Sequence, residues 1–393
     1  MRRTLIFLGI ALWMLVIVGS VWIIFAGPRW GDIGRILNAP TGAHTLLQKG
    51  QIALGSVQNI VIDCSYHSVE LRTTLGDTIK VRQYGDANTD ENALFSISVT
   101  DERIRIYFDN RTQITTGFFR FGSGFSPRLI VEIPEAFSAN LEISTSSGHI
   151  ELEDDFSLAN VDFRSSSGRV VIDGDLNVTG SINMSSTSGS IRIDDDMYSE
   201  NDIRLNTASG SINIDGEVHA RNLEANTASG SIRIERPVTA TERLSLQSIS
   251  GSIRVGASLK AETLSAQSTS GSVTLSGAYT ESFNLRSTSG SLRTGSVSGS
   301  GSANTVSGSI RLTLGEARGE VSLRSVSGSV RLELHPSLQF NLVAETSSGS
   351  INTNFPTERN NRGNRATATF GSDPTVNINA QSTSGGIRVE RIN

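Results

Sequence analysis

A Ser-Gly pair recurs along the second part of the chain at intervals of about 20 residues, and this repeat constrains the fold more than any other feature. The positions seven and five residues before each glycine, and two and four residues after it, are mostly apolar. The position three residues before the glycine is always Ser or Thr, and the position immediately before it is always Ser. The repeat glycines are Gly148, Gly168, Gly189, Gly210, Gly230, Gly251, Gly271, Gly290, Gly308, Gly328, Gly349 and Gly385.

Alternation of apolar and polar residues is the pattern of a β-strand with one buried face. A unit of about 20 residues cannot bury its own apolar face, so neighbouring units must complete the core. The repeat therefore predicts an all-β fold over residues 141–393, a single-stranded parallel β-solenoid (β-helix) of about twelve coils. We expect positions −7, −5, −3 and −1 before each glycine, and positions +2 and +4 after it, to face the interior, with Ser and Thr ladders at a corner. The glycine itself is expected to take a positive φ there.

Residues 44–140 are predicted to form a β-rich N-terminal part of the same domain. Runs of alternating residues at 60–62, 68–72, 78–82, 95–99, 103–107 and 129–133 indicate strands. Residues 27–43 contain Gly and Pro and are predicted to be a linker. The interval between Gly349 and Gly385 is longer than the others, and its polar segment at 354–374 is predicted to be a surface loop.

The N-terminus carries a long apolar segment, with 22 uncharged residues from Leu5 to Ala26. About 20 apolar residues span the hydrocarbon core of a bilayer, so residues 4–26 are predicted to be a transmembrane anchor. Residues 1–3 would be a cytoplasmic tail, and the solenoid would lie outside the cell membrane. The alternative is a cleaved signal peptide, with Val18 and Ser20 before the cleavage site. The apolar run is too long for a typical signal peptide, which favours the anchor.

Few residues in the chain suggest chemistry. Cys64 is the sole cysteine, and the five histidines are scattered without the spacing of metal ligands. The chain contains no nucleophile elbow, P-loop, zinc-protease motif or EF-hand loop. The net charge of −5 gives no basic footprint for nucleic acid. We therefore predict no catalytic residue, no cofactor and no nucleic-acid partner.

Arginine recurs three residues after the repeat glycine, at a position that should point outward. In register, these residues would form a row on one face of the solenoid. Arginine pairs well with phosphate, so the row can contact an anionic envelope polymer or a lipid headgroup. The alternative, which the pattern favours, is a solvated face that resists unwanted strand pairing. The arginines are Arg192, Arg233, Arg254, Arg293, Arg311, Arg331 and Arg388.

Acidic residues follow the repeat strands in the early coils and should cluster along one edge. Stacked carboxylates repel one another, so they either extend into water or are bridged by a hard cation such as Ca²⁺. Solvated carboxylates are the favoured interpretation. The candidate calcium ligands are Asp154, Asp173, Asp175, Asp194, Asp195 and Asp215.

Several motifs resemble a known bacterial family, called "putative adhesin" and of unknown function. These motifs are Ile60-Val61-Ile62-Asp63, Ile133-Pro134 and the blocks SSGHIEL, TSGSIRI and TASGSINI. The resemblance extends over roughly residues 50–393. It implies an exported β-solenoid behind one N-terminal transmembrane helix, with relatives of the envelope-stress type.

Three functions remain open from the sequence. The favoured one is a membrane-anchored cell-surface scaffold or adhesion and interaction protein without catalytic activity. An alternative is an accessory or regulatory protein of an envelope-stress response that acts through another membrane protein. A polysaccharide-active β-helix enzyme is the weakest, because the aromatic residues do not align in the repeat.

Overall fold

The computed structural model describes residues 45–85, 93–108 and 127–392. Apart from Thr45, these residues belong to one compact unit that comprises Leu46–Thr112 and Ser126–Asn393. The predicted tail, anchor and linker at 1–43 lie outside the described residues. Within the described part, no helix is long and apolar enough to cross a membrane.

The described residues contain 34 β-strands and no α-helix. The strands of the N-terminal part are β1 (Thr45–Ala53), β2 (Asn59–Cys64), β3 (Ser68–Thr74), β4 (Thr78–Gly85), β5 (Phe95–Val99), β6 (Arg103–Phe108) and β7 (Arg128–Pro134). The first repeats form β8 (Asn140–Thr145), β9 (Ile150–Leu152), β10 (Phe156–Leu158), β11 (Asn160–Ser165), β12 (Val170–Ile172), β13 (Leu176–Val178), β14 (Ile182–Ser186), β15 (Ile191–Ile193), β16 (Met197–Ser199), β17 (Asp202–Thr207) and β18 (Ile212–Ile214). The middle repeats form β19 (Val218–Thr227), β20 (Ile232–Ile234), β21 (Val238–Ser248), β22 (Ile253–Ser268), β23 (Val273–Ser287), β24 (Leu292–Val297), β25 (Ser300–Thr305), β26 (Ile310–Leu314), β27 (Gly319–Ser325) and β28 (Val330–Leu334). The C-terminal strands are β29 (Phe340–Thr346), β30 (Ile351–Thr353), β31 (Glu358–Arg359), β32 (Arg365–Phe370), β33 (Val376–Ser382) and β34 (Ile387–Arg391).

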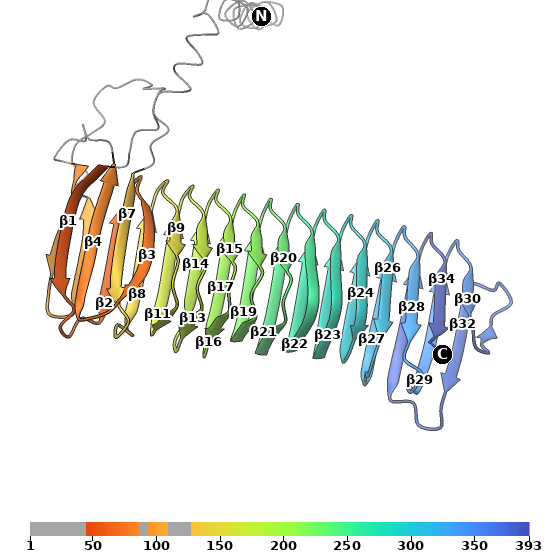
Figure 1. Ribbon diagram of the computed structural model, residues 1–393. Coiled ribbons are helices and arrows are strands. Elements are labelled where there is room, and N and C mark those ends of the chain that lie inside the picture. Colours follow the sequence, from red (N-terminus) through yellow and green to blue (C-terminus); the bar gives the residue numbers. More distant parts are fainter. Residues whose placement is uncertain (1–44, 86–92, 109–126, 393) are drawn as a thin grey trace, which may run out of the picture. The chain divides into compact units, whose positions relative to one another are not determined.

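The strands form a solenoid-like stack of coils, in which most strands pair in parallel with the strand one repeat further on (Figure 1). Val161 of β11 pairs with Ile182 of β14, which pairs with Ile203 of β17. A coil has three sides. Side 1 is the strand before the corner glycine, side 2 is the strand after it, and side 3 is the strand that leads to the next coil. Further along the stack, sides 3 and 1 merge into one strand such as β21, whose pairing with β22 contains a register shift, and in β22 side 2 joins them.

The interior of the stack is the apolar core that the repeat predicts. On β17 and β18, Ile203, Leu205, Ile212 and Ile214 are all fully buried. Their neighbours on the same strands face outward, as the period of two requires. Side 3 adds a third buried surface, with Met197 of β16 packed inside. The alternation alone had suggested only the two strands next to the glycine.

The corner glycines stack in register, but the reason for glycine differs from the prediction. None of the twelve is among the described glycines with a positive φ. A Cβ on Gly189 would instead lie 1.9 Å from the carbonyl oxygen of Gly168, and the other corners are equally tight. The predicted positive φ is therefore wrong. Glycine is required because successive corners touch through their backbones.

The Ser or Thr three residues before each glycine is buried and holds the corner together. Ser186 donates a hydrogen bond to the carbonyl oxygen of Gly168, at 3.0 Å, in the coil before. Its hydroxyl also accepts a hydrogen bond from the backbone N–H of Gly189, at 2.9 Å. The serine immediately before the glycine does not face the interior, since Ser188 is exposed. The chain bends directly after the buried hydroxyl, so the alternation ends there.

The two ends of the stack depart from sequence order. At the C-terminal end, β34 lies between β28 and β30, and β33 lies between β27 and β29 (Figure 1). The coil of Gly385 is thus inserted between the coils of Gly328 and Gly349. At the N-terminal end, β2 is inserted between β6 and β8, and β3 between β7 and β9.

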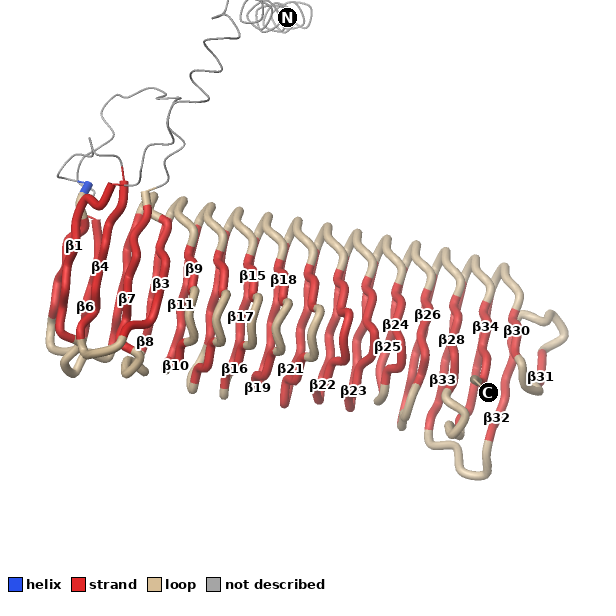
Figure 2. The backbone as a smooth tube through the Cα atoms, viewed as in Figure 1, coloured by secondary structure: helices blue, strands red, loops and turns tan. Residues whose placement is uncertain are grey.

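Antiparallel strands cover both ends. β4 pairs with β7 and β5 pairs with β6 at the N-terminal end. At the other end, β32 pairs with β29 and β31 pairs with β32 (Figure 2). The predicted loop at 354–374 is therefore wrong in part, because it contains both β31 and β32. An uncovered last coil would expose a row of unpaired backbone groups, and β32 satisfies those of β29.

Candidate binding surfaces

The seven predicted arginines do lie in one column, on the outward face of side 2. Arg233 pairs in register with Arg254, which pairs with Thr274 and through it with Arg293. The column continues through Arg311, Arg331 and Arg388 on adjacent strands. At its other end it reaches Arg192 through Asn213. We call this column the arginine row.

Most of the arginine row is neutralised by carboxylates. Arg192 pairs with Asp194, and Arg233 pairs with Glu235. In each pair the acid stands two residues after the arginine in the sequence. The hydrogen bond with Asp194 raises the pKa of Arg192.

Near the C-terminal end, two glutamates serve three arginines. Glu333 forms ion pairs with Arg311 at 3.0 Å and with Arg331 at 3.1 Å. Glu390 forms ion pairs with Arg331 and Arg388. The hydrogen bond from Arg388 lowers the pKa of Glu390. Within the arginine row, whose members are all described residues, only Arg254 and Arg293 have no ion-pair partner. Their coils carry Gly256 and Gly295 where most of the other coils carry an acid.

The acidic turns lie between sides 2 and 3, where several carboxylates accept hydrogen bonds from backbone N–H groups. Asp155 accepts a hydrogen bond from the N–H of Asp175 at 2.8 Å, and Asp175 accepts one from the N–H of Asp196 at 3.1 Å. Asp196 in turn accepts from the N–H of Glu217 at 2.7 Å. The next residue in this column is Pro237, which has no N–H, and the ladder ends there.

The six predicted calcium ligands share one edge but do not converge on a site. Asp154 accepts hydrogen bonds from the backbone N–H of Thr73, at 2.7 Å, and from its hydroxyl, at 3.2 Å. Asp195 is exposed and Asp215 is half-buried, in the turns of their own coils. Among the described residues, no three His, Cys, Asp or Glu side chains are grouped so as to hold a metal ion.

Asp173 is the most perturbed carboxyl of this edge. Burial raises its pKa to about 6, and a hydrogen bond with Asp194 and the charge of Asp194 act in the same direction. The two carboxyls can share a proton, which removes the repulsion between them.

A buried polar cluster near the N-terminal end was not predicted from the sequence. The ring of His67 stacks on Phe108 at 3.9 Å, and one ring nitrogen lies 3.0 Å from the amide nitrogen of Gln83. Burial lowers the pKa of His67 to about 4, so the ring is neutral at physiological pH. His67 takes the corner position of its coil, because the backbone of Gly148 packs on its carbonyl group. The cluster therefore shapes the first corner.

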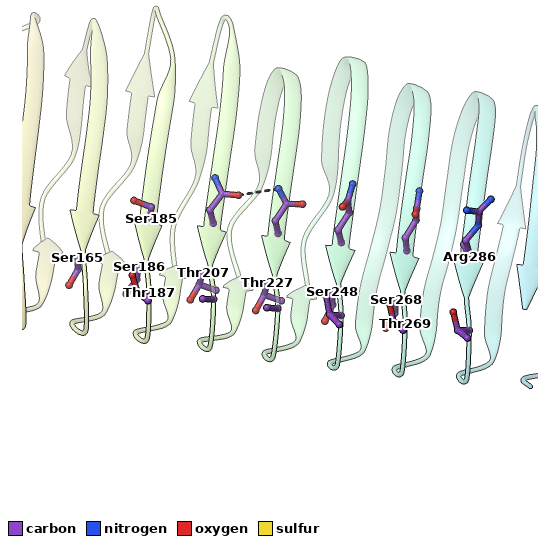
Figure 3. Close-up of a pocket in the computed structure, with 18 residues that line it drawn as sticks. Ser165, Ser185, Ser186, Thr187, Thr207, Thr227, Ser248, Ser268, Thr269 and Arg286 are labelled. Atoms are coloured by element: carbon purple, nitrogen blue, oxygen red, sulfur yellow. Dashed lines mark hydrogen bonds between the residues drawn. The ribbon is translucent and has the colours of Figure 1, made fainter. Parts of the chain in front are cut away.

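Side 1 carries a groove that sequence reasoning also missed. It has a volume of about 600 Å³ and runs across several coils beside the corners (Figure 3). Four amide side chains in successive coils line it, Asn206, Asn226, Gln247 and Gln267. All four stand four residues before a repeat glycine. The recurrence of an amide residue at this one repeat position is visible in the sequence.

Comparisons with known proteins identify the family. The model described as Toastrack DUF4097 matches residues 57–236 and 216–390. No curated protein is detectably similar to the chain.

Solved structures of low similarity were also found. One is a "putative adhesin" from Bacteroides fragilis, 11% identical, with 88% of this chain and 96% of that chain covered and a TM-score of 0.28. A second "putative adhesin", from Parabacteroides merdae, is 12% identical with the same coverage and a TM-score of 0.30. A "putative lipid binding protein" from Parabacteroides distasonis is 13% identical, with 88% and 96% covered and a TM-score of 0.24. Identification rests on the family match, which spans most of the chain: this protein belongs to the Toastrack DUF4097 family.

Proposed function

We propose that the chain is a membrane-anchored scaffold or adhesion protein of the cell surface, without catalytic activity, that binds an anionic envelope polymer or lipid headgroup along its arginine row. The uncharged segment from Leu5 to Ala26 supports the anchor, because it is long enough to span a bilayer. The observation that carries the binding proposal is the pair Arg254 and Arg293, two unneutralised guanidinium groups in one regular column.

The spacing of these two arginines suits a polymer. They lie two coils apart, which is about 10 Å at the usual strand spacing. A guanidinium group binds phosphate or carboxylate through two parallel hydrogen bonds. Each exposed contact is weak alone and is screened by salt, so a ligand with several anionic groups gains most from the row.

Binding of linear polyphosphate and of a soluble short-chain phosphatidylglycerol to the full-length chain tests this proposal. We expect binding at low ionic strength that weakens as salt is added. The double variant R254Q/R293Q should bind about thirtyfold more weakly, because each arginine contributes about 1 kcal/mol at such a surface. Comparison of the two ligands shows whether the polymer or the headgroup is preferred.

The control variant is K260Q/R243Q, which removes the same charge from exposed positions in other columns. This variant should bind like the wild type. Equal losses in the two variants would mean that net charge, and not the arginine row, causes binding. No loss in R254Q/R293Q would refute the proposal.

A further inference from the structure

The amide groove on side 1 is a second surface, separate from the arginine row. Asn206 pairs in register with Asn226, Asn226 with Gln247, and Gln247 with Gln267. Ser185 precedes this amide row and Arg286 follows it. Four coils therefore present the same carboxamide group at the same place, one coil spacing apart.

The amide groups do not simply bond to one another along the stack. Asn226 donates a hydrogen bond to Asn206 at 3.0 Å (Figure 3). Asn226 also donates within its own coil, to Glu224 at 2.6 Å. Gln247 and Gln267 donate only within their own coil, to Ser245 at 3.3 Å and to Ser265 at 2.9 Å.

A carboxamide has two donors and an oxygen with two lone pairs. Each of these two glutamines uses one donor within the part of the chain that the structure describes, so most of its hydrogen-bonding capacity faces the groove.

The residues two before the repeat glycine form the wall beside the amide row. This wall is apolar in three central coils, at Ala208, Ala228 and Ile249, and threonines take the same position on either side, at Thr187, Thr269 and Thr288. Ile249 is 57% exposed, which is unusual for a large aliphatic side chain. The lining of these coils carries no charge between Ser185 and Arg286. The groove thus offers uncharged hydrogen-bonding groups on one side and C–H surface on the other.

This chemistry and spacing select among linear polymers. An extended peptide rises about 3.3 Å per residue and repeats a face every second residue, out of step with coils about 4.8 Å apart. A peptide also cannot add to side 1 as a strand, because its strands are paired on both edges. The groove lining contains no cation in its central coils, so a polyanion finds no partner in the groove. A chain of pyranose rings advances by close to one coil spacing per sugar and carries both hydroxyl groups and C–H faces.

We propose that the amide groove binds a linear, uncharged polysaccharide, which runs along the stack with about one sugar per coil. Its hydroxyl groups bond to the carboxamides of Gln247 and Gln267, and its ring C–H faces pack on Ala228 and Ile249. This site goes beyond the proposed function, and it depends on neither the arginine row nor its ligand.

The test is isothermal titration of the full-length chain, in a detergent without a sugar head group, with cellohexaose and with N-acetylchitohexaose. We expect at least one of them to bind, equally well at low and high ionic strength. The variant Q247A/Q267A should bind at least about tenfold more weakly, because it loses several hydrogen bonds. I249D should also bind more weakly, since it places a charge on the apolar wall.

R254Q/R293Q is the matched control and should bind the sugars like the wild type. It also separates the two proposals, since it is the variant expected to lose polyphosphate. Circular dichroism of each variant verifies the fold, which substitutions at these outward positions should leave intact. Failure of both sugars to bind the wild type would overturn the inference, as would equal binding by Q247A/Q267A.

Discussion

Replacing Gly251 by Ala tests why the corners carry glycine. The added Cβ would lie 1.9 Å from the carbonyl oxygen of Gly230, where ordinary contact begins at 3.4 Å, so it is 1.5 Å too close. The corner must move, and this breaks two hydrogen bonds. Ser248 donates to the carbonyl oxygen of Gly230, and its hydroxyl accepts from the N–H of Gly251, both at 2.9 Å. Overpacking costs about 1–3 kcal/mol and each lost bond about 1 kcal/mol, giving a local cost of about 4 kcal/mol.

Native-state hydrogen exchange is the suitable assay, because a long stack of repeats does not unfold in one two-state step. Amides of the coils next to Gly251 should exchange about a thousandfold faster, since each 1.4 kcal/mol is a factor of ten. The control is G277A, whose Cβ would meet only the carbonyl oxygen of Ser296, at 3.4 Å. Neither glycine has a positive φ, so only the steric contact differs. Equal exchange in the two variants would refute the steric explanation.

Two further predictions concern the acidic edge and the coil order. The raised pKa of Asp173 means that the native state holds its proton more tightly than the unfolded chain does. This stability is fully present below the ordinary aspartate pKa and is lost as the pH rises through about 6. D173N should abolish this pH-dependent change in the hydrogen exchange of its coil. A change that persists in D173N would mean that another group titrates there. Separately, cysteines at Glu320 and Asn377 should form a disulfide, because these residues pair in register. Cysteines at Glu320 and Asn341 should not, because β33 lies between them, and the opposite result would contradict the inserted coil.

The body of the fold could be predicted because each coil repeats the same local rule. Ile203, Leu205, Ile212 and Ile214 were assigned to the interior from their spacing around Gly210, and all four are buried. The repeat length then determines which residues stack. The arginine row was predicted from the same spacing, since a residue between two buried positions on a strand must point outward.

The ends of the stack could not be predicted in this way. The repeat around Gly385 looks like any other, and nothing local in it shows that it pairs with the coil of Gly328. That choice depends on the pairing of segments distant in sequence. The contact that excludes a Cβ at the corners also exists only between stacked coils. By contrast, the pairing of Arg192 with Asp194 was readable, because residues two apart on a strand share a face.

Both ends of the stack contain an inserted coil and carry antiparallel strands. The coils between them form a middle part whose length can change. Each middle coil contacts only its two neighbours, and all of them offer the same register to the next. Removal or duplication of one repeat would therefore leave both ends intact and change the reach of the molecule by one coil spacing. β32 covers β29 at the C-terminal end, so the number of middle repeats, and not the pairing of β29 with another chain, determines how far this stack extends.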